Sequence, residues 1–101
     1  MSNYRALALQ LTCRTVNGAS HRAEAEAIVQ ESIERIGRQV AASLAFIGPD
    51  CKLVVLPEYA LTGFPMGESI EEWRTKACFA VDGAEYDALA ALAHRHAVHL
   101  C

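Results

Sequence analysis

The chain has 101 residues, of which 52% are hydrophobic and 21% are charged, and its formal net charge is -3. This length fits one small domain, and the apolar content is high enough to build a core, so the composition excludes an intrinsically disordered chain. The acidic balance and the scattered lysines and arginines argue against nucleic acid as a partner and against a polybasic membrane anchor, because both kinds of binding need clustered positive charge.

The first two predicted elements are a strand and a long helix. Residues 6–11 (ALALQL) form a short apolar run, which predicts a buried strand. From about residue 21 to residue 46, apolar residues recur at spacings of three and four, which predicts one amphipathic helix. Ser20 is the expected N-cap of this helix, and Gly48–Pro49 ends it.

A second strand and a loop follow this helix. Residues 52–56 (KLVVL) are almost continuously apolar and β-branched in the middle, which predicts a strand covered on both faces, as in a parallel sheet flanked by helices. Residues 58–67 hold two glycines and a proline and are expected to form a loop. A short helix over residues 69–73 is then expected, with Ser69 as its cap.

The last predicted elements are a helix and the start of a strand. Residues 82–85 (DGAE) have the form of a capping box, and a helix follows them. Residues 96–101 (HAVHLC) look like the beginning of another strand. Helices between strands imply a parallel or mixed sheet. Because the last strand reaches the final residue, we expect the chain to be the N-terminal portion of a single, truncated domain.

The four cysteines, at positions 13, 51, 78 and 101, show neither C-x-x-C pairing nor zinc-ribbon spacing. Three of them lie in or beside apolar stretches, where a free thiol behaves as a small hydrophobe. We therefore expect all four to be reduced and the protein to be cytoplasmic. No window reaches the roughly 18 apolar residues that a membrane span needs.

Glu58 is the most unusual position in the chain. It comes directly after Pro57, at the carboxyl end of the second predicted strand. Ligands of open α/β sheets bind outside the carboxyl ends of strands, and a carboxylate there would be partly desolvated and suited to act as a general base. The alternative is a solvated loop acid or a helix-cap partner.

Three histidines, His94, His96 and His99, form an H-x-H-x-x-H pattern. A transition-metal site is one interpretation, but residues two apart on a helix do not share a face, and the pattern spans the boundary between the last predicted helix and strand. Histidines at the end of a helix also interact favourably with its dipole. We therefore expect no metal site.

The segment around Glu58 resembles the signature of the nitrilase superfamily of carbon–nitrogen hydrolases. Residues 53–65 (LVVLPEYALTGFP) combine an apolar strand, Pro-Glu and a Thr-Gly-aromatic-Pro turn in fixed spacing. Residues 6–12 look like the first strand of that family, and residues 20–47 stand where it has its first helix. The chain thus resembles the N-terminal portion of a single carbon–nitrogen hydrolase domain.

This resemblance implies an α/β fold, namely the N-terminal part of a four-layer α-β-β-α sandwich, and a Glu-Lys-Cys triad that needs no organic cofactor and no metal. Glu58 matches the general base, which activates the Cys thiol for attack on a small amide or nitrile. The Lys and Cys of the family lie well downstream, and Lys52, Lys76 and Cys101 do not stand in their motifs. The chain alone is therefore expected to be inactive.

Some alternatives stay open. Tyr59 and Phe64 either bind substrate or pack as ordinary aromatic residues, whereas Trp73 is expected to pack. The full-length protein is expected to hydrolyse a small amide or nitrile, with an amide favoured. The rival hypothesis is an inactive scaffold that serves oligomer assembly, because an isolated portion would expose sheet edges and apolar faces. The family resemblance implies a homo-oligomer, a dimer or larger.

Overall fold

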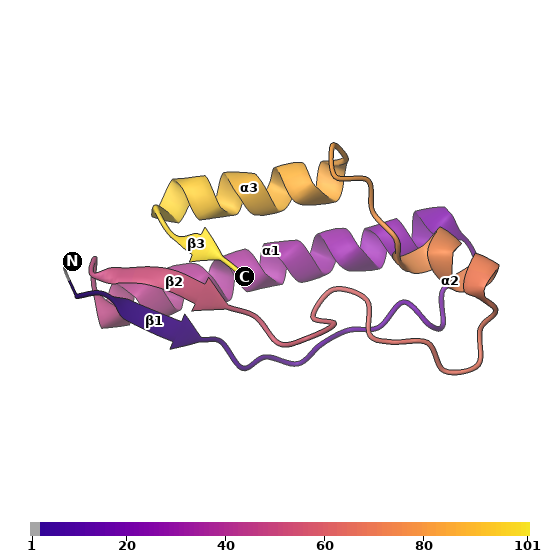
Figure 1. Ribbon diagram of the computed structural model, residues 1–101, viewed down its shortest axis with the longest axis horizontal. Helices are drawn as coiled ribbons and strands as arrows, with labels where there is room; N and C mark the ends of the chain where they lie inside the picture. The colour runs from indigo at the N-terminus through magenta and orange to yellow at the C-terminus, as the bar shows by residue number, and fades with distance from the viewer. Residues whose placement is uncertain (1–2) are drawn as a thin grey trace.

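The computed structural model describes residues 3–101, in which a three-stranded sheet is packed against helices (Figure 1). The order of elements confirms the predicted α/β class. In chain order the elements are β1 (Arg5–Ala8), α1 (Arg22–Ile47), β2 (Cys51–Val55), α2 (Ile70–Ala77), α3 (Ala84–His96) and β3 (His99–Leu100). No helix within the described range is both long and apolar enough to cross a membrane.

The sheet has the order β1-β2-β3, and both strand pairs are parallel, as predicted. β1 is shorter than expected and ends at Ala8 instead of residue 11. The N–H of Leu9 still donates to the carbonyl of Val55 at 2.9 Å. Beyond that point β2 has ended and Pro57 follows, so the chain after β1 has no partner strand.

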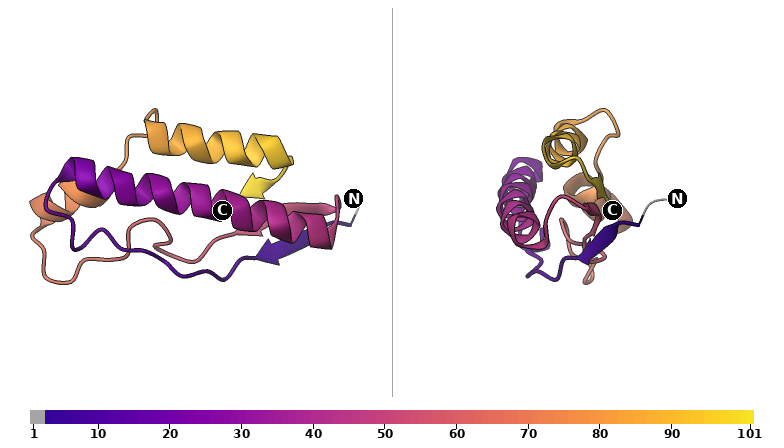
Figure 2. Two further views of the ribbon diagram at one scale, coloured as in Figure 1. Left: turned by 180° about the vertical axis from the view of Figure 1, so that it is seen from behind. Right: turned by 90° about the vertical axis from the view of Figure 1, so that its left-hand side faces the viewer.

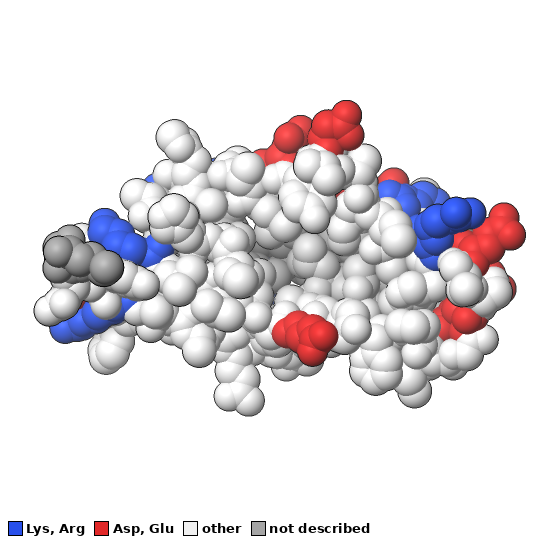
Figure 3. Space-filling view, viewed as in Figure 1, with Lys and Arg blue, Asp and Glu red and all other residues white. Residues whose placement is uncertain are grey.

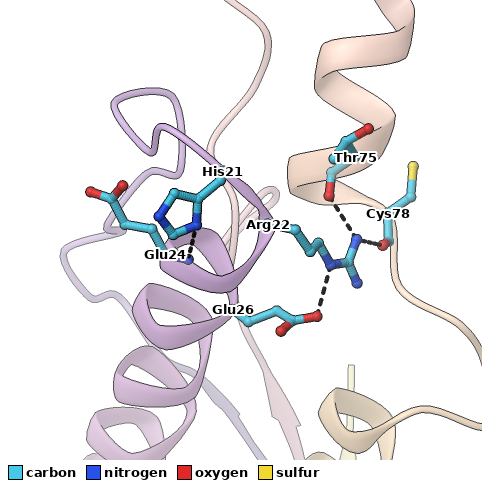
Figure 4. Close-up of polar contacts among 6 residues, drawn as sticks. All are labelled: His21, Arg22, Glu24, Glu26, Thr75 and Cys78. Carbon is cyan, nitrogen blue, oxygen red and sulfur yellow. Dashed lines mark hydrogen bonds and ion pairs between the residues drawn. The ribbon is translucent and has the colours of Figure 1, made fainter.

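Helix α1 confirms the predicted amphipathic helix almost to the residue, but its N-cap is His21 and not Ser20. The Nδ1 atom of His21 accepts a hydrogen bond from the N–H of Glu24 at 3.3 Å (Figure 4). The Glu24 carboxylate reaches back to the N–H of Ser20 at 2.9 Å. The predicted cap was wrong by one residue because an imidazole nitrogen supplies the acceptor that a serine hydroxyl usually provides.

The buried stripe of α1 divides into two core clusters. Its C-terminal half packs on the sheet and on α3, where Ile36 and Val40 contact Val54 of β2 and Leu92 of α3. Its N-terminal half packs on the long loops beyond the sheet, where Val29 joins a cluster with Val16, Ala19, Ala25 and Ile33. One helix therefore holds both the strands and the loops that follow them.

Helix α2 begins at the predicted Ser69 capping box but continues to Ala77, beyond the expected end at residue 73. Arg22 of α1 binds the C-terminal end of α2 (Figure 4). Its Nη1 donates to the carbonyls of Thr75 and Cys78, each at 2.8 Å. The same guanidinium pairs through Nε with Glu26 at 2.8 Å. The last carbonyls of a helix lack intrahelical partners, so these contacts stabilise the end of α2.

Helix α3 lacks the predicted capping box. Its N-cap is Gly83, without a side-chain hydrogen bond, rather than Asp82. Glu85, the residue expected to close the box, is only 6% exposed and lies on the buried side of the helix. The helix thus starts one residue later than the box requires. Its close approach to α1 depends on Gly37, where a Cβ would lie 2.8 Å from Cδ1 of Leu92.

Only one face of the sheet is covered by described elements, and a cover on the second face of β2 stays a prediction. Figure 2 shows α1 and α3 on the same side of the strands in its end-on view. Because side chains alternate along a strand and Val54 points at α1, Leu53 and Val55 point away from it. Val55 is 37% exposed on this outer face.

Candidate active site

Glu58 lies just past the carboxyl end of β2, the central strand of the sheet, as the sequence predicted. The N–H of Leu56 donates to the carbonyl of Cys101 at 2.7 Å, so the sheet extends one residue beyond β2 before Pro57 ends it. The side chain of Glu58 is exposed. The sequence predicted that this carboxylate is partly desolvated. Within residues 3–101 this prediction is wrong, because Glu58 lies in a groove that is open to solvent.

A tight turn follows Glu58 directly. Tyr59 has a φ of 57°, in the left-handed region, and its carbonyl accepts the N–H of Gly63 at 2.9 Å. The N–H of Ala60 donates to the carbonyl of Pro57 at 3.2 Å. A left-handed conformation in a bulky residue costs about 1–2 kcal/mol, and such residues cluster at functional sites. The turn fixes the direction in which the chain leaves Glu58.

An open groove of about 910 Å³ lies beside this turn. One side comes from the segment after β1 and the other from the loop after β2. The lining includes Cys13, Thr15 and Asn17 on the first side and Tyr59, Phe64 and Met66 on the second. Figure 3 shows one isolated group of acidic atoms near the middle of the face it displays, with no basic atoms next to it.

The aromatic residues of the loop have different roles. Tyr59 and Phe64 line the groove and contact each other, with ring centroids 5.8 Å apart and an interplanar angle of 46°. They remain 53% and 54% exposed. Trp73 is half-buried against the core cluster around Val16, which confirms that it packs. Substrate binding by Tyr59 and Phe64 stays a prediction.

The Thr-Gly of the motif has a physical reason in this structure. The carbonyl of Thr62 accepts the N–H of Val16 at 3.0 Å, which brings the two sides of the groove together. Gly63 has a φ of 70°, and a Cβ at this position would lie 2.6 Å from Cγ2 of Thr15. Only glycine combines this backbone conformation with so close an approach.

A side-chain clasp joins the two sides at the end of the groove. Nδ2 of Asn17 donates to the carbonyl of Phe64 and to Oε1 of Glu68, each at 3.0 Å. Oε2 of Glu68 accepts the N–H of Met66 at 2.6 Å. Hydrogen bonds from the N–H groups of Met66 and of Glu68 itself, and then from Asn17, hold the pKa of Glu68 below its usual range.

Sequence reasoning missed this clasp. Neither Asn17 nor Glu68 stands in a sequence motif that predicts a functional role. The two residues are 51 positions apart, so no local pattern links them. A link of this kind becomes visible only when the fold places the two segments side by side.

Several residues weighed from the sequence lie away from Glu58. Lys52 stands near the opposite end of β2, and Nζ of Lys76 binds the backbone carbonyl of Asn17 at 3.1 Å. His94 and His96 end α3, and His99 begins β3. Within residues 3–101, no three His, Cys, Asp or Glu side chains gather closely enough to hold a metal ion.

The thiols have separate positions. All four cysteines are free: Cys51 is buried, Cys13 is half-buried in the groove, and Cys78 and Cys101 are exposed. Cys101 accepts and donates only backbone hydrogen bonds, with Leu56 and Val54, at the edge strand.

Comparison with known families points to the same region. The family model described as carbon-nitrogen hydrolase matches residues 8–101, which include β2, Glu58 and the whole groove. No curated protein and no solved structure matches the chain.

Proposed function

The chain belongs to the carbon-nitrogen hydrolase family, and from this premise we propose that the groove beside Glu58 is one side of an active site that hydrolyses a non-peptide carbon–nitrogen bond in a small amide or nitrile. The observation that supports this most is the place of Glu58. It follows the central strand of a parallel sheet and lines an open groove, where α/β enzymes bind their ligands.

In the proposed mechanism, Glu58 is the general base of a Glu-Lys-Cys triad whose Lys and Cys lie outside residues 1–101. The Glu58 carboxylate takes the proton of the Cys thiol, and the thiolate attacks the amide carbon. The Lys ammonium stabilises the oxyanion that forms. The tetrahedral intermediate then expels the amine, which receives the proton from Glu58. Water, deprotonated by Glu58, then attacks the thioester carbon. The Cys thiolate leaves and takes the proton back from Glu58, and the carboxylic acid is released.

The groove lining supports an uncharged substrate. Among the described residues, Glu58 is the one formal charge that lines the groove, and Phe64, Pro65 and Met66 give it an apolar side. A carboxylate on the substrate would meet Glu58 with no lining Lys or Arg from residues 3–101 to offset the repulsion. We therefore propose a neutral amide that carries a hydrocarbon or aromatic group.

The outer face of the sheet supports the larger architecture implied by the family. Leu53 and Val55 point away from the helices, and on β1 the exposed Ala6 and Ala8 alternate with the inward Leu7. Apart from His99 of β3, this face is apolar, and it lacks a covering layer within residues 3–101. We propose that a second sheet packs on it, as in a four-layer α-β-β-α sandwich.

The test of this function is ammonia release by the protein that carries residues 1–101 together with the Lys and Cys of the family. Hexanamide is expected to be hydrolysed with a kcat/KM at least about tenfold above that of adipamate, which has the same six-carbon chain but ends in a carboxylate. Absence of ammonia release from any amide or nitrile would contradict hydrolysis. A preference for adipamate would contradict the proposed substrate class alone.

A second candidate function is favoured by other exposed apolar side chains. Phe46, Ile70 and Val81 are 93%, 89% and 82% exposed, and Val55 adds to the uncovered sheet. Exposed apolar side chains and unpaired strand edges promote association between chains. The alternative is thus an inactive module that serves oligomer assembly, and the active enzyme is also proposed to be a homo-oligomer.

A further inference from the structure

The loop segment 63–68 forms one side of the groove without support from a strand or helix of its own. It lies between β2 and α2, outside the regular elements. Its apolar side chains are presented outward: Phe64 is 54% and Met66 is 73% exposed. Loops with few buried contacts are mobile unless their backbone groups are held elsewhere. The position of this side therefore depends on its polar contacts.

Both oxygens of the Glu68 carboxylate hold this segment. Oε2 accepts the N–H of Met66 at 2.6 Å, and Oε1 accepts Nδ2 of Asn17 at 3.0 Å. The same Asn17 amide donates to the carbonyl of Phe64 at 3.0 Å. One carboxylate and one amide thus hold the backbones of both exposed lining residues against the opposite side of the groove.

The clasp is anchored on its other side as well. Nζ of Lys76 donates to the backbone carbonyl of Asn17 at 3.1 Å, which ties the asparagine to α2. Glu72 provides an instructive contrast, because it also accepts a backbone N–H, that of Ser69 at 2.7 Å. Its hydrogen bonds close the cap of α2 and do not reach the groove lining.

We propose that Glu68 is a positioning residue for this groove: with Asn17, it fixes Phe64 and Met66 as the surface that binds the apolar group of the substrate. The identity of the substrate in this inference rests on the proposed function, whereas the claim that Glu68 holds segment 63–68 in place does not.

The chemistry of the clasp requires a carboxylate. Both partners of Glu68, the Met66 N–H and the Asn17 NH2 group, are donors. Glutamine has the same shape but offers one acceptor and one NH2 group, so one of the two donors would then face another donor. A Glu68→Gln substitution therefore breaks the clasp without removing volume.

The experiment compares Glu68→Gln with its matched control Glu72→Gln in the 101-residue chain, with far-UV circular dichroism to check the fold. The first readout is NMR hydrogen exchange of the Met66 amide. It is expected to speed up at least about tenfold in Glu68→Gln, because the Met66 N–H then meets at best a neutral amide oxygen and the segment loses one of its two contacts with the side chain at position 68, and to stay within about twofold in Glu72→Gln. Unchanged Met66 exchange in Glu68→Gln would overturn the hold on the loop.

The second readout is NMR titration with hexanamide. The dissociation constant is expected to rise about threefold or more in Glu68→Gln and to stay unchanged in Glu72→Gln. Faster Met66 exchange with unaltered hexanamide affinity would overturn the role in binding. A wild-type chain that does not bind hexanamide would contradict the proposed function of the groove and the binding role together, while Met66 exchange would still decide the hold on the loop.

Discussion

At the scale of single residues, the groove is shaped by backbone conformations that few side chains tolerate. Tyr59 and Gly63 both lie in the left-handed region, and Gly63 also touches Thr15. The Thr-Gly of the sequence motif is thus explained by packing between two loops, whereas the Pro-Glu before it places a carboxylate. The motif thus joins a structural requirement and the proposed general base in a single stretch of chain.

Substitutions at three glycines distinguish the cost of a positive φ from the cost of a steric clash. Gly63→Ala is expected to lower the free energy of unfolding by about 2–4 kcal/mol, because a positive φ and a clash act together. Gly67 has a φ of 114° but open space around it. Gly67→Ala is therefore expected to lower the free energy of unfolding by about 1 kcal/mol. Gly18→Ala, which meets nothing within 4 Å, should stay within about 0.5 kcal/mol. Urea unfolding measures all three, and equal losses would refute the contact with Thr15.

Glu68 also gives stability a dependence on pH. Its pKa is lowered in the folded chain from the usual 4.5, chiefly by the Met66 N–H, so the folded state binds fewer protons than the unfolded state near that value. The stability from this group is therefore present above about pH 4.5 and is lost as pH falls through the lowered pKa. Glu68→Gln should flatten the fall of unfolding free energy between about pH 5 and pH 3. A slope identical to that of wild type would contradict the clasp.

At the scale of elements, the sequence predicted what depends on hydrophobic period and missed what depends on distant partners. Helix α1 and the parallel pairing of β2 follow from apolar spacing within one segment. The early end of β1 depends on where β2 stops, and the loss of the Asp82 capping box depends on the burial of Glu85. The clasp between Asn17 and Glu68 joins segments with no local signal in common.

The junction of α1 and α2 depends on one side chain. Arg22 donates to two carbonyls at the end of α2, so Arg22→Met should leave them without this partner. We expect α2 amides to exchange about tenfold faster by hydrogen exchange, since a charged hydrogen bond contributes about 1.5 kcal/mol. The exposed Arg38 on the same helix serves as control through Arg38→Met. Equal exchange in the two variants would show that α2 is held by its apolar contacts alone.

At the scale of the whole molecule, the described residues form an elongated body of two layers. The radius of gyration is 14.8 Å and the extents are 46 × 24 × 24 Å, whereas a compact domain of 100 residues has a radius near 13 Å. Helix α1, with 26 residues, is about 39 Å long and extends well past the short strands. The sheet that it covers remains bare on its other side.

This bare face is expected to drive association of the chain. Sedimentation at micromolar concentrations should give a mass above the 11.0 kDa of one chain, because apolar sheet surface is removed from water. Val55→Lys places a charge on that face and should shift the chain toward monomer. Ala42→Lys, at an exposed position of α1, should not. A wild-type chain that sediments as a monomer would argue against association through this face.

The role of Glu58 is tested most directly by turnover of an amide in the protein that also carries the Lys and Cys of the family. Because Glu58 is exposed, Glu58→Gln should keep the fold and the unfolding free energy. Its kcat for hexanamide should fall by about 10²–10⁴, since a general base is lost. Glu71→Gln, an exposed acid of α2 outside the groove, should retain full turnover. Wild-type kcat in Glu58→Gln would contradict the assignment of Glu58 as the base.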